Sequence, residues 1–304
     1  MNVESYPKRV RVVEVGPRDG LQNERAVSVE TKVTLIESLV EAGVTTVECG
    51  SFVSAKRVPQ MADTAAVLRK LRRKPGISYT VLVPNLRGLE AAVACGVEEI
   101  AVFASASESF SQSNIQSSIP GSLQRLGAVA RQAGELKIRV RGYVSCVLGC
   151  PFEGDVPTAA VASVAKALLD MGCYEISLGD TIGVGTPLKT RAMLERVAHE
   201  APMDRLAVHF HDTWGQALAN VLIALQLGVA AVDASVAGLG GCPYAPGATG
   251  NLATEDLIYL LNGMGIETGI DLEKLAAAGR TISHALGREP VSRAAAAIAA
   301  KGRA

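Results

Sequence analysis

The sequence predicts an α/β fold, a (β/α)8 TIM barrel with additional C-terminal helices, from three observations. Short apolar runs rich in β-branched residues alternate with amphipathic helical patterns along nearly all of the 304 residues. The predicted strands are almost continuously apolar, as in parallel sheets covered by helices. A glycine also follows several of the predicted helices, just before the next strand begins. We assign residues 1–304 to a single domain, with the barrel at about 10–265 and a helical extension at about 266–304.

Eight strands and the helices between them follow in order from this pattern. The predicted strands cover residues 10–15, 45–49, 78–83, 99–104, 138–145, 174–178, 206–211 and 231–236. The helices after the first seven strands cover residues 29–41, 62–74, 86–95, 122–135, 157–171, 187–200 and 216–227. Residues from 254 onward supply the eighth helix, and residues 271–286 pack after it. An open doubly wound sheet is the alternative, and the lack of an early glycine-rich dinucleotide loop counts against it.

Four of the joints between a predicted helix and the next strand contain a glycine: Gly43, Gly96, Gly172 and Gly228. Glycine adopts the left-handed conformation that closes a helix at little cost. We therefore interpret these glycines as the residues that end the helices and start the return to the sheet.

The composition argues against several classes of partner. The 30 basic and 30 acidic residues cancel, so we expect no nucleic-acid partner and no anionic membrane surface as a partner. No apolar run approaches the roughly 18 residues that a membrane span needs. The first residues show neither a secretory core nor a transit-peptide pattern, so we expect a cytoplasmic protein. The six cysteines do not suggest a disulfide framework in a chain of this length.

Polar side chains gather at the carboxyl ends of the predicted strands, where the active sites of such barrels lie. They include Arg18 and Asp19 after the first strand, Glu48 in the second, Asp180 after the sixth, and His209, His211 and Asp212 at the seventh. Any one of the aspartates could be only a helix cap. Capping alone does not explain polar residues at so many strand ends.

His209 and His211 lie two residues apart at the end of an apolar strand pattern. Side chains alternate along a strand, so both imidazoles point to the same face. Two neutral imidazoles on one face can bind a divalent metal, with a carboxylate and water completing the shell. A pair of ordinary half-buried histidines is the alternative. The chain has only 4 histidines, which favours the metal site.

Asp19 can face this pair, because the first, seventh and eighth strands adjoin when the barrel closes. Two imidazoles, one carboxylate and the amide oxygen of Asn251 make a mixed shell suited to Mg²⁺ or Mn²⁺. The absence of a nearby thiolate pair disfavours structural zinc. Arg18 carries a planar fork of donors that could stabilise an enolate or carboxylate oxygen. It could also pair with Glu48 or Asp180 for structure, and both roles can hold together.

The segment 238–250 contains five glycines and two prolines, more than a simple connection needs. We interpret it as a mobile lid with Cys242 at its centre. A thiol there could act as an acid or base near neutral pH if the metal and Arg18 lower its pKa. The alternative role for Cys242 is that of a small buried apolar side chain.

These motifs resemble the 3-hydroxy-3-methylglutaryl-CoA lyase family, which belongs to the group of barrels that includes isopropylmalate and homocitrate synthases. The resemblance extends from about residue 10 to residue 286. The segments that carry it are 13–24, 51–61, 141–146, 174–186, the strand of the two histidines, and 238–256. The first and last of these segments are highly specific when they occur together.

The resemblance implies a barrel that binds a divalent cation and cleaves its CoA thioester to acetyl-CoA and acetoacetate. An acyl-CoA is then the ligand, and a homodimer is the expected assembly. By position, it implies metal binding by Asp19, His209, His211 and Asn251, thioester binding by Arg18, catalysis by Cys242, and supporting acidic roles for Glu48 and Asp180.

The implied chemistry suits these residues. A retro-aldol type cleavage removes a proton from a tertiary alcohol, which a metal acidifies, and leaves a thioester enolate. Arg18 can stabilise the enolate charge, and Cys242 can protonate its carbon. The alcohol proton could go to Asp19 or to a metal-bound water. Two positions depart from the family pattern: Phe210, which points away from the site, and the pair 49–50, which leaves the acyl group open.

Other functions remain as alternatives. The substrate could be a longer branched 3-hydroxy-3-alkylglutaryl-CoA, or the chain could be a synthase that runs in the condensing direction. Barrels with a paired-histidine motif also hydrolyse amides and esters, but they usually carry that motif on the first strand. A barrel that only binds CoA or metal is a further alternative, and the complete set of site residues counts against it.

Overall fold

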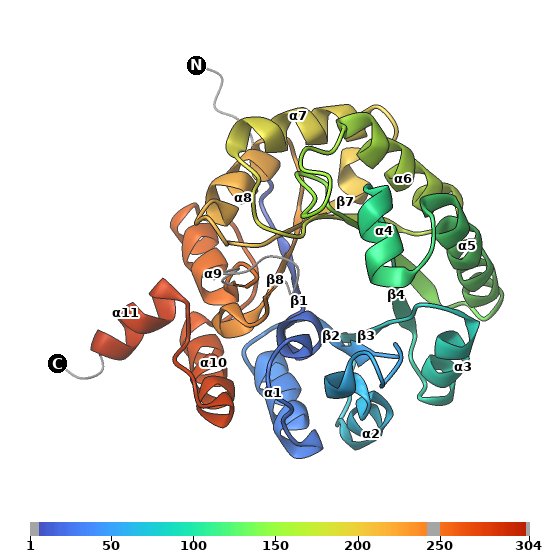
Figure 1. Cartoon of the computed structure of the whole chain (residues 1–304). Helices are drawn as coiled ribbons and strands as arrows, with labels where there is room; N and C mark the ends of the chain where they lie inside the picture. The colour runs from blue at the N-terminus through green and yellow to red at the C-terminus, as the bar shows by residue number, and fades with distance from the viewer. Residues whose placement is uncertain (1–5, 242–249, 302–304) are drawn as a thin grey trace.

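The computed structural model describes residues 6–241 and 250–301. Its centre is a closed barrel of parallel strands in the order β1-β2-β3-β4-β5-β6-β7-β8, and the helices surround it (Figure 1). The strands are β1 (Arg11–Glu14), β2 (Thr46–Ser51), β3 (Ser78–Leu82), β4 (Glu99–Ser105), β5 (Arg139–Ser145), β6 (Glu175–Asp180), β7 (Leu206–Phe210) and β8 (Ala231–Ala234). Strand β8 pairs with both β1 and β7, which closes the barrel and confirms the predicted fold.

The outer layer contains the predicted helices and one helix, α4, that was not predicted; every strand is followed by at least one helix. The helices are α1 (Val29–Glu41), α2 (Thr64–Lys70), α3 (Leu86–Ala94), α4 (Glu108–Ile115), α5 (Ile119–Glu135), α6 (Thr158–Asp170), α7 (Pro187–Ala198), α8 (Ala217–Gln226), α9 (Thr254–Gly263), α10 (Leu272–Leu286) and α11 (Arg293–Lys301). The outward side chains of the strands pack against these helices in one large apolar core. None of the helices in the described residues is both long and apolar enough to cross a membrane.

The structure differs from the predicted elements mainly in three places, besides shifts of a few residues at the ends of other elements. Helix α2 ends at Lys70 instead of extending to residue 74, because the backbone is already extended at Leu71. Helix α4 lies between β4 and α5, where the sequence analysis expected only a connection; Ser107 caps it by accepting a hydrogen bond from the N–H of Phe110. Shortly after β1, the five residues Gly16–Gly20 form a short π-helix, η1.

The four predicted glycine joints are confirmed. The φ angles are 100° at Gly43, 64° at Gly96, 98° at Gly172 and 95° at Gly228. These values lie in the region that side-chain-bearing residues avoid, which is why glycine ends these helices.

Charged residues cross the interior of the barrel, although the strands look apolar in sequence. Arg141 on β5 donates to both oxygens of Asp233 on β8, at 2.7 and 3.0 Å, and its Nε donates to Glu175 at 2.6 Å. Arg11 on β1 pairs with the other oxygen of Glu175. Strands β5 and β8 are not neighbours in the sheet, so this ion-pair chain spans the interior. Each charged side chain in this ion-pair chain has a partner of opposite sign, which offsets the cost of burying it.

Candidate functional site

A cavity of about 820 Å³ opens at the carboxyl ends of the strands. Its lining includes Arg18, Asp19, His209 and His211, together with Gly241 at the edge of the described chain. The sequence analysis predicted a site at this end of the barrel, and the structure brings these four side chains into one cavity. Cys242 lies outside the described residues, directly after Gly241.

The π-helix η1 places Arg18 and Asp19 at the mouth of β1. The carbonyl of Val15 accepts hydrogen bonds from the N–H groups of Arg18 and Gly20, both at 3.1 Å, so the chain turns tightly as it leaves the strand. A side chain at Gly20 would lie 2.6 Å from the hydroxyl of Ser235, so only glycine lets η1 approach the segment after β8 this closely. Short π-helical turns are frequent at functional sites.

Asp19 lies between the two imidazoles. Its Oδ2 is 3.8 Å from Nε2 of His209 and 3.8 Å from Nε2 of His211. One ligand atom from each of the three residues lies within 4.8 Å of the others, which makes the group a candidate metal site. Burial raises the pKa of Asp19, but Arg18 and the two imidazoles outweigh it and hold that pKa well below its usual range. Asp19 is therefore a carboxylate at neutral pH.

The spacing of these atoms fits a divalent cation. Two ligand atoms that are each about 2.1 Å from one ion lie roughly 3 to 4.2 Å apart, depending on the angle between them. The observed 3.8 Å lies in this range and is too long for a hydrogen bond. The Nδ1 atom of His211 is buried without a hydrogen bond in the described residues, and the Nδ1 atom of His209 has an ion-pair contact at 3.4 Å with Asp233 but no hydrogen bond. The donor set of two imidazole nitrogens and a carboxylate suits such an ion.

Asn251 lies beside Asp19 but presents its amide nitrogen. Its Nδ2 donates to Oδ2 of Asp19 at 2.9 Å and to the carbonyl of Leu239 at 3.1 Å. To offer its oxygen to an ion, the amide would have to turn over. The structure thus brings the fourth predicted ligand to the site, and its role as a ligand stays a prediction.

Arg18 is held in place by two carboxylates. Its Nε donates to Glu48 and its Nη1 donates to Asp19, both at 2.5 Å. The ring of Tyr143 lies 5.6 Å from the guanidinium carbon. Burial raises the pKa of Glu48, and Arg18 offsets part of that effect. The predicted pairing of Arg18 with Glu48 is confirmed, and it fixes the guanidinium at the edge of the cavity.

Comparisons with known proteins identify the family. A family model described as HMGL-like matches residues 9–282. The chain belongs to the HMGL-like family. Among the relatives of this HMGL-like chain, the 3-hydroxy-3-isohexenylglutaryl-CoA/hydroxymethylglutaryl-CoA lyase of Pseudomonas aeruginosa is 58% identical over 298 residues, which cover 98% of this chain and 99% of that protein. The mitochondrial hydroxymethylglutaryl-CoA lyase of Homo sapiens is 59% identical over 292 residues, covering 96% of this chain and 90% of that protein.

Solved structures agree with this assignment. The crystal structure of hydroxymethylglutaryl-CoA lyase from Pseudomonas aeruginosa matches with a TM-score of 0.96 and 57% identity, covering 97% of this chain and 99% of that chain. An HMG-CoA lyase from Acinetobacter baumannii, in complex with coenzyme A and 3-methylmalate, matches with a TM-score of 0.92 and 36% identity, covering 96% of each chain.

Asp180, the last residue of β6, bonds the loop that follows it, and its supporting role in the site stays a prediction. Its two oxygens accept hydrogen bonds from the N–H groups of Val184 and Gly185, at 3.2 and 2.8 Å. The carboxylate therefore shapes the loop after β6, next to the strand that carries the histidines. Its neighbours in sequence, Gly179 and Thr181, line the cavity instead.

Asp233 is a residue of the HMGL-like site that the sequence analysis missed. Its Oδ2 lies 3.4 Å from Nδ1 of His209, while Arg141 and the hydroxyl of Ser177 bond the same carboxylate. Burial raises the pKa of Asp233, but Arg141 outweighs it, and the pKa lies below its usual range. A carboxylate behind a metal-binding imidazole fixes the ring orientation and strengthens the ligand. In the sequence, the signal that could have identified Asp233 is its position as a single charged residue inside the otherwise apolar predicted strand 231–236.

Two buried glutamates, also missed, shape the chain after β8. Glu14 accepts hydrogen bonds from the N–H of Val236 and the hydroxyl of Thr254, and Glu255 accepts from the N–H of Ala237. Burial raises the pKa of Glu14 to about 7 and that of Glu255 to about 8. Ala237 has a φ of 57°, so these carboxylates hold a strained turn just before the glycine-rich segment.

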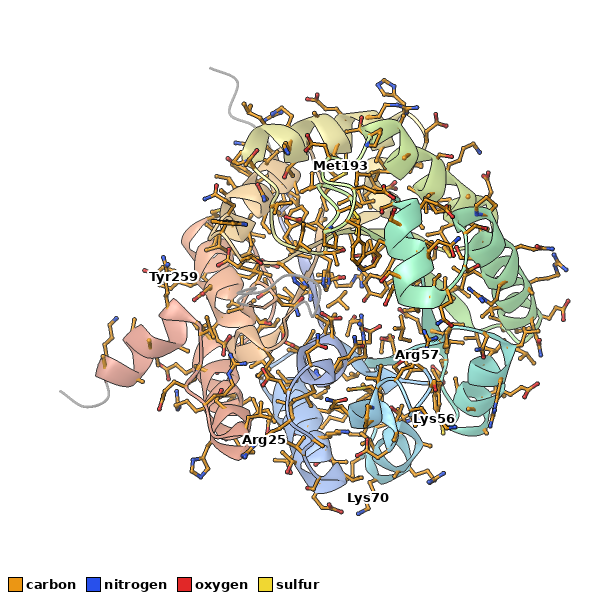
Figure 2. The ribbon with its side chains drawn as sticks, viewed as in Figure 1. Arg25, Lys56, Arg57, Lys70, Met193 and Tyr259 are labelled. Carbon is orange, nitrogen blue, oxygen red and sulfur yellow. The ribbon has the colours of Figure 1, made fainter. Side chains whose placement is uncertain are left out.

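The cavity mouth of this HMGL-like chain carries exposed cations. Arg57 and Arg125 line it, and Arg57 donates to the carbonyl of Asn114 at the end of α4 at 3.3 Å. Figure 2 shows Lys56 next to Arg57, on the side of the barrel that carries α2. The mouth is therefore suited to an anionic group, while the interior holds the candidate metal site.

We expect Asp233→Asn to weaken metal binding about 10- to 100-fold, because the neutral amide no longer polarises His209. Mn²⁺ titration followed by electron paramagnetic resonance measures this affinity directly. Ser177→Ala is the matched control, since it removes a partner of Asp233 without changing the charge, and it should weaken binding far less. An Asp233→Asn protein with lower thermal stability but unchanged Mn²⁺ affinity would show that Asp233 has only a structural role.

Proposed function

We propose that this chain is a carbon–carbon lyase that cleaves 3-hydroxy-3-methylglutaryl-CoA to acetyl-CoA and acetoacetate. One observation carries the proposal: a carboxylate, two imidazoles and a fixed arginine converge in one cavity. The chain that holds them is 58% identical, over 98% of its length, to the hydroxymethylglutaryl-CoA lyase of Pseudomonas aeruginosa described above. The arginine side chains at the mouth of the cavity, Arg57 and Arg125, supply positive charge suited to the phosphates of CoA.

For the cation we propose Mg²⁺ or Mn²⁺, held by Asp19, His209, His211 and Asn251. When bound, the ion would acidify the tertiary hydroxyl of the substrate. The low pKa of Asp19 makes its carboxylate a weak base, which favours the role of ligand over that of proton acceptor. The alcohol proton would then pass to water at the site, the other acceptor considered in the sequence analysis. Asp233 would keep the imidazole of His209 in its binding orientation.

Arg18 is the group we assign to the thioester. Glu48 and Asp19 hold its Nε and Nη1, so the third nitrogen, Nη2, is the donor we assign to the thioester oxygen. When the bond between C2 and C3 breaks, the carbon that carries the hydroxyl becomes the ketone carbon of acetoacetate. The electron pair of that bond gives a thioester enolate, with its negative charge on the thioester oxygen. A fixed cation stabilises this charge without reorganising. We propose that Cys242 then protonates the enolate carbon to give acetyl-CoA.

The decisive assay is incubation with 3-hydroxy-3-methylglutaryl-CoA in Mg²⁺ or Mn²⁺. We expect acetoacetate and acetyl-CoA in equal amounts, loss of activity with a chelator, and recovery when the cation is restored. Release of free CoA without acetoacetate would indicate a metal-dependent hydrolase instead. A folded, metal-loaded protein that forms no acetoacetate would contradict the proposal. The single-domain assignment, the homodimer and the cytoplasmic location remain predictions.

A further inference from the structure

One sector of the cavity is apolar, next to the polar site. Val53, Leu82, Ala101, Phe103 and Tyr143 pack together as a separate cluster, apart from the core between strands and helices. We call this cluster the apolar wall. Four of its members line the cavity, and Ala101 lies buried behind them.

The apolar wall is built by neighbouring strands. Leu82 on β3 is in register with Ala101 on β4, and Phe103 on β4 is in register with Tyr143 on β5. Ala101 and Phe103 are two residues apart on β4, so both point into the barrel. Val53 follows β2 and completes the wall at the cavity.

Tyr143 joins the apolar wall to the catalytic groups. Its ring lies 5.6 Å from the guanidinium carbon of Arg18 and 6.0 Å from the imidazole of His209, edge to face. A substrate carbon held between Arg18 and His209 therefore has the wall on one side. The inward side chains of β5, β6 and β8 below the site are charged or polar, among them Arg141, Glu175 and Asp233.

Resting on the proposed function, we infer that the apolar wall receives the alkyl substituent on C3 of the substrate and accepts groups larger than methyl. The hydroxyl, carboxylate and thioester of the substrate all need polar partners, and the C3 substituent is the group near the reacting carbons that does not. Val53 and Phe103 are only half-buried, so apolar surface is open to the cavity. The Pseudomonas aeruginosa relative is named for a substrate with an isohexenyl group at this carbon as well as for the methyl compound.

The test compares two substrates that differ only at C3: 3-hydroxy-3-methylglutaryl-CoA and 3-hydroxy-3-isohexenylglutaryl-CoA. We expect the unaltered protein to cleave both, with kcat/KM values within about tenfold of each other, because the half-buried side chains of Val53 and Phe103 leave apolar surface open to the longer group. No cleavage of the larger compound alongside rapid cleavage of the methyl compound would overturn the inference and leave the proposed function intact. No cleavage of either would contradict the proposed function itself.

Two variants should move the ratio of these kcat/KM values in opposite directions. Val53→Phe narrows the space before the apolar wall and should lower the isohexenyl-to-methyl ratio at least tenfold. Phe103→Ala opens space that only the longer group fills and should raise the ratio at least threefold. Ile115→Phe is the matched control, since Ile115 lines the same cavity from α4, away from this cluster, and should leave the ratio unchanged.

The ratio separates the C3 group from the rest of the substrate, because both compounds carry the same CoA. Equal losses for both compounds in Val53→Phe and Phe103→Ala would place the apolar wall against the CoA arm and overturn the inference. An unchanged ratio with unchanged rates would overturn it as well. Thermal unfolding of each variant checks the fold, and Phe103→Leu gives a milder second variant if Phe103→Ala is unstable.

Discussion

Asp19→Asn should reduce kcat by about 1,000-fold or more and weaken Mn²⁺ binding by more than 100-fold. Its carboxylate is the only anionic group between His209 and His211 among the described residues that form the metal cluster. Loss of a direct ligand exceeds the 10- to 100-fold effect typical of a residue behind a ligand. The substitution keeps the size of the side chain, so the fold should survive. Mn²⁺ affinity and steady-state kinetics on the same preparation measure both effects.

The matched control for this change is Asp212→Asn. Asp212 follows His211 directly, but its carboxylate accepts a hydrogen bond from the N–H of Ala217 at the start of α8. We expect Mn²⁺ affinity to change less than threefold in this variant. If Asp19→Asn bound Mn²⁺ as well as the unaltered protein does, the cation would have to lie elsewhere, and the proposed site would be wrong.

Arg18→Lys should lower kcat about 100- to 1,000-fold while Mn²⁺ affinity stays within about tenfold. Removal of one fixed donor to a developing oxyanion typically costs this much in other enzymes. Lysine keeps the charge, but it cannot bond Glu48 and Asp19 and present a third nitrogen at the same time. The informative measurement is kcat and Mn²⁺ affinity on the same variant, because Arg18→Lys should lower only kcat whereas Asp19→Asn should impair both.

Arg57→Lys is the control for that change. Arg57 lines the same cavity near its mouth, and we expect Arg57→Lys to change kcat less than threefold. A stability measurement is also needed for Arg18→Lys, since Glu48 is fully buried and depends on the guanidinium. Turnover near that of the unaltered protein in a folded Arg18→Lys variant would contradict the role assigned to Arg18.

The strands and most helices could be predicted because their signals are local. A β-branched run predicts a strand wherever it lies, and the positive φ at Gly43 and Gly172 follows from glycine itself. The side-by-side position of His209 and His211 is equally local, since it needs only the alternation along a strand. Once a closed barrel is assumed, strand order alone brings Asp19 to the same mouth.

What the sequence analysis missed depends on contacts across the interior. Asp233 and Arg141 are 92 residues apart, and nothing in either strand alone indicates that they pair. The same holds for Glu14, since two of its hydrogen-bond partners, Val236 and Thr254, lie after β8. The amide orientation of Asn251 is likewise set by Asp19 and Leu239 and not by its sequence neighbours. These pairings exist only in the assembled barrel.

The ion-pair chain across the interior links assembly of the protein to its readiness to bind a cation. Asp233 belongs to the last strand to be synthesised, whereas Arg141 precedes it by three strands. Until β8 pairs with the rest of the sheet, the carboxylate of Asp233 is missing from the interior. Arg141 then lacks the group to which it donates two hydrogen bonds, and His209 lacks the carboxylate next to its Nδ1. A nascent or truncated chain without that final strand would then offer the ion an incompletely oriented imidazole. Full orientation of the candidate metal site therefore requires a barrel in which β8 has paired with both β1 and β7.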